Sequence, residues 1–310
     1  MRAVDGLVSA RDWDGLLDLA DACEHALERG KQLWPIVAHA EYRIALEAPA
    51  DLAANMLGSP LNRFMLGPLT EVIASTHSWA EVADEIETPH DAAFVAHERV
   101  LRGEDVGDDL RAHAETVDVP LRLFGWEPPY ALATYRADHV EVAEPLLRPP
   151  RLREEEPQPD PLAEDSALSE ALLDLVAPWT TQSNGAARAV VVEGTALGAA
   201  SALTGNRLRI APLEGWQAVR WIAWAAASGG AHGRRRGAAF GRSAALHLLG
   251  MLVEEPGDAL SSIEWCAWDE GEPEKGWVLR LSFGSREEGW AAAVAATDLL
   301  DEEESGGTES

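Results

Sequence analysis

The sequence predicts a mainly α protein, in which an irregular, helical-repeat-like N-terminal half precedes a C-terminal α+β domain with a small antiparallel sheet. Three observations predict this fold class. Apolar residues in the first half recur at three- and four-residue steps, which is the period of an amphipathic helix. The second half contains β-branched and aromatic runs between glycine-bearing turns. A proline- and glutamate-rich stretch separates the halves, and 310 residues suffice for two domains that each bury a core.

The N-terminal domain, residues 1–144, is expected to consist of short helices joined by short connections. Asp12 can cap a first helix, and breaks at proline and glycine divide the apolar stripes that follow into helices over residues 33–46, 50–57, 68–86 with a break near Thr76, and 89–101. Two alike segments, VAHAEYRIAL from Val37 and VAHERVLRGE from Val95, suggest repeated helical hairpins of the kind that stack into an α-solenoid.

Two stretches are expected to lack regular packing. Residues 145–167 contain six prolines, which lack a backbone N–H donor, and three consecutive glutamates, whose charges repel one another. We therefore interpret this stretch as a linker. Residues 302–310 are acidic and rich in glycine and serine, and we expect them to form a disordered tail.

The C-terminal domain, residues 168–301, is expected to place helices on one face of a sheet. Alternating apolar runs bounded by turns predict strands over residues 188–193, 207–211, 262–268 and 277–283. Helical periodicity predicts helices over residues 168–175, 216–227, 235–253 and 287–300. The last two strands flank DEGEPEKG, so they should form an antiparallel hairpin.

The charge balance narrows the classes of partner. The chain has 25 basic and 53 acidic residues, a formal net charge of -28, which predicts repulsion from phosphate backbones and anionic lipid. Nucleic acid is therefore disfavoured as a partner. The acidic N-terminus does not resemble a secretory signal and no apolar run is long enough for a membrane span, so a cytoplasmic location without membrane contact is expected.

One basic segment, SGGAHGRRRGAAFGR from Ser228, stands out from this acidic background. If a helix begins near Gly233, its first N–H groups, the neighbouring glycines and the arginine side chains would converge on an anion. The candidate ligand-binding residues are Gly229, Gly230, His232, Gly233, Arg234, Arg235, Arg236 and Arg242. Two other interpretations remain open: the arginines pair with carboxylates of the chain while the glycines allow close helix packing, or the segment binds an acidic protein.

Several sequence segments, among them WIAWAAASGGAHGRRRGAAFGR, IEWCAWDEGEPEKGW, GWAAAVAATD, LGPLTEV and VAHERVLRGED, resemble a family of uncharacterised actinobacterial proteins. The resemblance covers most of the chain outside the predicted linker and tail. It implies a bacterial cytoplasmic protein and brings no assigned activity, cofactor or catalytic residue.

Motifs for catalysis and metal binding are missing from the sequence. His97 and Glu98 lack the second histidine of a zinc-binding HExxH helix, no GxSxG occurs, and the two cysteines have no accompanying ligands, so no metal site is predicted. No cofactor is identified. Two hypotheses remain. In the first, the protein is a non-enzymatic interaction or scaffold protein that docks partners through both domains. In the second, it binds a phosphate- or carboxylate-bearing small molecule on the segment from Gly229 to Arg242, and an enzyme remains an open alternative.

Overall fold

The fold described here is that of a computed structural model. It describes residues 1–27, 33–61, 64–114, 117–142, 152–156, 158–204, 207–271 and 276–299. Residues 145–151 and Pro157 of the predicted linker, and the whole predicted tail, lie outside these residues. Within the described residues, every helix is too short or too polar to span a bilayer.

The chain divides into two compact units. The first consists of Met1–Leu123, Leu132–Ala143 and Gly237–Ala239, and the second of Phe124–Ala131, Glu144–Arg236 and Phe240–Ser310. This division differs from a single cut at the linker in two short segments. Phe124–Ala131 belongs to the second unit, and Gly237–Ala239 belongs to the first. Each unit is described on its own below.

The first unit is an irregular array of helices, as the sequence predicts. Its helices are α1 (Arg2–Ala10), α2 (Trp13–Leu27), α3 (Trp34–Glu47), α4 (Ala50–Asn55), α5 (Leu69–Thr76), α6 (Trp79–Val82) and α7 (Pro89–Leu101), with 3-10 turns η1 (Met56–Gly58) and η3 (Leu110–Ala112). The predicted break near Thr76 separates α5 from α6. The sequence reading missed α1 and the hairpin of β1 (Ala133–Tyr135) and β2 (Val140–Val142).

Two apolar clusters stabilise this unit. One lies between α1, α2 and α3, with Leu16, Val37 and Ile44 fully buried. The other joins α3, α5, α6 and α7 to the β1–β2 hairpin. The two segments with similar sequences fall in α3 and α7, which both belong to the second cluster, so their shared pattern reflects burial of the same kind of stripe.

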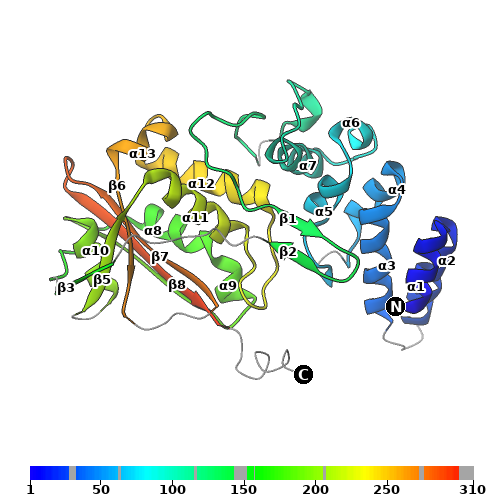
Figure 1. The fold of residues 1–310 in the computed structure, drawn as a ribbon, viewed down its shortest axis with the longest axis horizontal. Helices are drawn as coiled ribbons and strands as arrows, with labels where there is room; N and C mark the ends of the chain where they lie inside the picture. The colour runs from blue at the N-terminus through cyan, green and yellow to red at the C-terminus, as the bar shows by residue number, and fades with distance from the viewer. Residues whose placement is uncertain are drawn as a thin grey trace. The chain divides into compact units, whose positions relative to one another are not determined.

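The second unit is built on a six-stranded sheet with the strand order β3-β5-β6-β7-β8-β4 (Figure 1). Its strands, each antiparallel to its neighbours, are β3 (Arg153–Glu155), β4 (Ala186–Val192), β5 (Leu208–Leu213), β6 (Glu264–Asp269), β7 (Trp277–Ser285) and β8 (Trp290–Asp298). Its helices are α8 (Ser166–Leu175), α9 (Ala177–Thr181), α10 (Ala196–Leu203), α11 (Gly215–Ala227), α12 (Ala238–Leu252) and α13 (Ala259–Ser262), with the 3-10 turn η4 (Pro256–Asp258).

Helices cover both faces of this sheet, not one face as expected. Helix α10 packs with Val192, Ala291 and Ala293, which lie on one face. Because side chains alternate along a strand, Val191 and Ala292 point to the opposite face, where α8, α9 and α11 contact the sheet. The predicted β6–β7 hairpin is confirmed by the pairing of Trp265 with Phe283 and of their neighbours.

The predicted helix over residues 287–300 is wrong, because this stretch forms β8. Alanine favours helices, but β8 lies between β4 and β7 and is buried on both faces. Its small side chains let α10 approach, and Ala199 and Ala200 of that helix pack against Ala291 and Ala293. Tertiary packing has therefore overridden helix propensity.

The described part of the predicted linker contains regular structure. Strand β3 pairs with β5 at the edge of the sheet, and all three of its residues are exposed. Further along, Leu162 forms a β-bridge with Val192, and the Asp160 carboxylate accepts a hydrogen bond of 2.8 Å from the Thr195 N–H. Edge positions tolerate proline-rich sequence because one side of the backbone needs no partner.

Candidate functional site

The glycine- and arginine-rich segment forms a loop before α12 and not a helix start at Gly233. Helix α12 begins at Ala238, after Gly237, whose φ of 96° is left-handed. A Cβ on Gly229 would lie 2.1 Å from the Gly233 carbonyl oxygen, and a Cβ on Gly233 would lie 2.2 Å from that of Gly229. The two glycines therefore allow close backbone contact inside the loop. Close helix packing, one of the interpretations above, applies to Gly241, which packs against α11.

The backbone N–H groups of this loop donate to other parts of the second unit. The Ala231 N–H donates to Asp298 Oδ2 at 2.5 Å, and the His232 N–H donates to Ser183 Oγ at 3.2 Å. The Arg234 N–H donates to Gln182 Oε1 at 2.9 Å. These amides were expected to face an anion, but they donate hydrogen bonds to oxygen atoms of the chain itself.

The first N–H groups of α12 also have carboxylate partners. Gly237–Ala239 belong to the first unit, where Ala238 and Ala239 donate to Glu71 Oε1 at 3.3 Å and Glu98 Oε1 at 2.6 Å. Both carboxylates are buried, and Arg102 donates to Glu98 at 2.6 Å. Negative charge at a helix N-terminus is stabilising, and here the protein supplies that charge itself.

Arg236 holds the ends of two helices together. Its guanidinium donates to the carbonyl oxygens of Ala226 at 2.7 Å, Asp174 at 3.0 Å, and Leu175, which lie at the C-termini of α11 and α8. It also lies over the Phe240 ring, 4.2 Å from the centroid. Burial lowers the pKa of Arg236 to about 10. A cation at helix C-termini satisfies carbonyls that have no partner within the helix.

Arg242 is fully buried and paired with Glu127, both in the second unit. Arg242 Nε and Nη2 donate to the two Glu127 oxygens at 2.8 Å each, and the Tyr130 hydroxyl donates to the same carboxylate at 2.5 Å. The side chains of Arg242 and Glu127 are 0% and 1% exposed. Burial raises the pKa of Glu127, but hydrogen bonds and charge from Arg242 outweigh burial, so the pKa lies below its ordinary value.

The eight predicted residues therefore do not converge on one point. Arg236 and Arg242 have different partners, Arg234 and Arg235 are partly buried, and only His232 is exposed. Of the three interpretations, the geometry at Arg236 and Arg242 matches the one in which arginines are paired within the chain.

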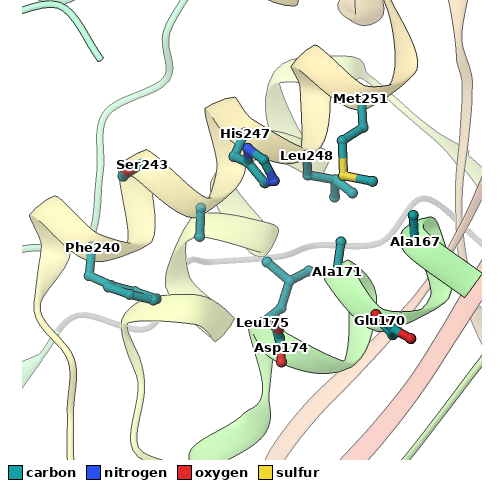
Figure 2. Close-up of a pocket in the computed structure, with 11 residues that line it drawn as sticks. Ala167, Glu170, Ala171, Asp174, Leu175, Phe240, Ser243, His247, Leu248 and Met251 are labelled. Carbon is teal, nitrogen blue, oxygen red and sulfur yellow. The ribbon is translucent and has the colours of Figure 1, made fainter. Parts of the chain in front are cut away.

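A groove that the sequence reading missed lies between α8 and α12, with a volume of about 410 Å³ (Figure 2). The side chains of Phe240, His247 and Met251 come from α12, while Glu170 and Asp174 lie across from them on α8. Its lining residues are Ala167, Glu170, Ala171, Asp174, Leu175, Phe240, Ser243, Ala244, His247, Leu248 and Met251.

Each helix contributes one continuous stripe to this groove. On α12 the lining positions follow each other by three, one, three, one and three residues, and on α8 by three, one, three and one. This spacing is that of a seam along which helices pack. Ala171, Ser243 and Ala244 are small lining residues, while Phe240 and Met251 stand near the ends of the groove and His247 lies between those ends.

The polar side chains of the groove are not arranged for a proton relay. No hydrogen bond joins Ser243, His247 and the two α8 carboxylates within the described residues, and Glu170 and Asp174 form no salt bridge there. The described residues also contain no cluster of three or more metal-ligating side chains. The groove offers a binding surface with apolar walls and two carboxylates at its edge.

A larger cavity of about 810 Å³ lies along β3, β5 and β6. Its lining includes opposite charges that already pair, with Arg286 Nη2 2.5 Å from Glu264 Oε1. A third, of about 260 Å³, is lined by Arg280 and Glu270, which form a 2.7 Å ion pair. The carboxylates of the α8–α12 groove, by contrast, form no salt bridge with a described residue, although the charge of Asp174 acts on the nearby Arg236 guanidinium.

Comparison with known proteins gives one match. A family model described as a family of unknown function, DUF6183, matches residues 1–283. The chain belongs to this family. No curated protein and no solved structure matches it.

Proposed function

We propose that this member of the DUF6183 family is a cytoplasmic, non-enzymatic interaction protein, and that a segment of a partner protein docks in the groove between α8 and α12. The observation that carries the proposal is the pair of helical stripes that line the groove without closing on one another. When a third element covers the apolar surface between two helices and removes it from water, the free energy of the system falls.

Exposed groups in the groove support this assignment. Met251 is 39% exposed and Phe240 is partly buried, although both are large apolar residues. Exposed apolar side chains that line a concave surface are typical of interaction sites.

Binding of a phosphate- or carboxylate-bearing molecule on the segment from Gly229 to Arg242 is the weaker proposal. It would require the loop amides and Arg242 to exchange their present partners for the ligand. Breaking the buried Arg242–Glu127 pair alone costs several kcal/mol, on the order of 3–5.

The test is recovery of a stoichiometric protein partner from the native host with two matched variants. Met251 lies in the groove and Leu173 lies on α8 outside it, with 39% and 37% of their surfaces exposed. We expect Met251→Arg to lose the partner and Leu173→Arg to retain it. Retention by both variants would contradict docking in this groove.

A further inference from the structure

Resting on the proposed docking function, we infer that the occupant of the α8–α12 groove is an amphipathic α-helix that carries basic residues four positions apart. The class of partner follows from the shape of the groove, from the spacing of its residues and from its charge. Each of these three properties is independent of the other two.

The shape of the groove fits a helix of about three turns. Its lining on α12 runs from Phe240 to Met251, which are 11 positions apart, and the rise of about 1.5 Å per residue makes this about 16 Å. Helices pack side by side when rows of side chains fit between one another, and both walls present such rows. An extended strand would need unpaired backbone groups beside it, and both walls are helices, whose interior backbone groups are paired within the helix.

The small residues set how closely the occupant approaches. Ala171 on α8 and Ser243 and Ala244 on α12 are small lining residues, so a large apolar side chain of the occupant can approach the helices there, beside the exposed His247. Leu175 and Leu248 are buried at its base and give that side chain an apolar contact surface. This arrangement accepts leucine-sized residues at three- and four-residue spacing.

The charge of the groove selects a basic occupant. Glu170 and Asp174 lie four positions apart on α8, so they occupy the same face one turn apart. Both are exposed, and neither forms a salt bridge with a described residue. The charge of Asp174 also acts on Arg236, whose guanidinium donates to the Asp174 carbonyl oxygen at 3.0 Å. Arginine or lysine residues four positions apart on the occupant match this pair, and the net charge of -28 steers such a helix toward the protein.

The first arm of the test reads the occupant directly. The photo-crosslinker p-benzoylphenylalanine replaces Met251 in the full chain, with the same replacement of Leu173 as the control, and the crosslinked segment is sequenced by mass spectrometry. We expect a segment with apolar residues at three- and four-residue spacing and two or more basic residues four apart. A segment that is acidic, or that contains prolines within the crosslinked stretch, would overturn the helix assignment.

The second arm measures the role of charge, using the crosslinked segment as a synthetic peptide. Glu170→Gln with Asp174→Asn should weaken its binding by about threefold to thirtyfold at low salt, the range for two exposed ion pairs, and raising the salt should reduce this difference. The control is Asp14→Asn with Asp18→Asn, which removes equal charge from exposed residues four apart on α2. The control should bind within twofold of the parent.

The outcomes separate the two proposals. If Met251 crosslinks a partner but both double variants bind it equally, the docking function stands and the basic-helix inference is wrong. If no protein crosslinks at Met251, or if Leu173 crosslinks it equally, both are wrong. A basic helical segment that is weakened only by the groove variant supports both.

Discussion

The loop before α12 and the groove beside the same helix differ in how their charged groups are used. In the loop and in α12, Arg236 and Arg242 are engaged by carbonyl groups and by a buried carboxylate. In the groove, Glu170 and Asp174 are exposed and form no salt bridge within the described residues. The comparison teaches that a conspicuous cluster of charge in a sequence marks a place where charge is needed, either for folding or for binding, and that only the partners distinguish the two.

The largest effect on stability is expected from Arg242. Arg242→Met leaves the Glu127 carboxylate buried without its cation, so the free energy of unfolding should fall by about 3–5 kcal/mol. Urea unfolding followed by circular dichroism measures this. Arg242→Met combined with Glu127→Leu should recover much of the loss, because no charge is then left buried. A single variant as stable as the parent would show that the pair is not structural.

The same pair should make stability depend on acid. The folded-state pKa of Glu127 is lowered from 4.5, so the unfolded chain binds its proton first as the pH falls. The pair therefore stabilises the fold fully above about pH 5 and loses this contribution as the pH falls through the lowered pKa. Urea midpoints between pH 7 and pH 3 should decline less steeply for the double variant, Arg242→Met with Glu127→Leu, than for the parent. Equal slopes would contradict the assignment.

A smaller loss is expected from the loop glycine Gly230. Its φ is 74°, and an added Cβ would lie 2.0 Å from Asp298 Oδ2, the atom that accepts from the Ala231 N–H. Gly230→Ala should lower the free energy of unfolding by about 1–3 kcal/mol. Gly250, an exposed residue of α12 with open space around it, is the control, and Gly250→Ala should raise stability by about 0.5–1 kcal/mol.

The smallest effect on stability is expected in the groove. Glu170→Gln with Asp174→Asn should change the free energy of unfolding by less than about 0.5 kcal/mol, because both carboxylates are exposed and surface charges contribute little. Urea unfolding measures it beside the Arg242 variant. A loss of several kcal/mol would mean that these carboxylates are structural, and the contrast between the two regions would disappear.

The sequence was sufficient to predict most helices and the β6–β7 hairpin. Apolar stripes correctly predicted α3, α7, α8 and α11, because helical periodicity is local information. It was not sufficient for β8, whose alanines favour a helix in isolation and form a strand because α10 packs against them. Propensity is weak compared with burial on both faces of a sheet.

The site was less predictable than the fold. The partner of Arg242 is 115 residues away in the chain, and nothing local to the arginine indicates Glu127. The groove stripes were visible as periodicity in both helices, but periodicity shows which residues share a face and not whether another element covers that face. The uncovered stripes emerged only when α8 and α12 were placed in space.

Hydrogen exchange of the partner-bound protein tests the central claim most directly. With the crosslinked segment bound, amide exchange should slow in α8 and α12, which line the groove, and stay unchanged in α1–α7 and in residues 228–236. Slower exchange in residues 228–236 with α8 unchanged would place the partner on the arginine loop and contradict docking in the groove.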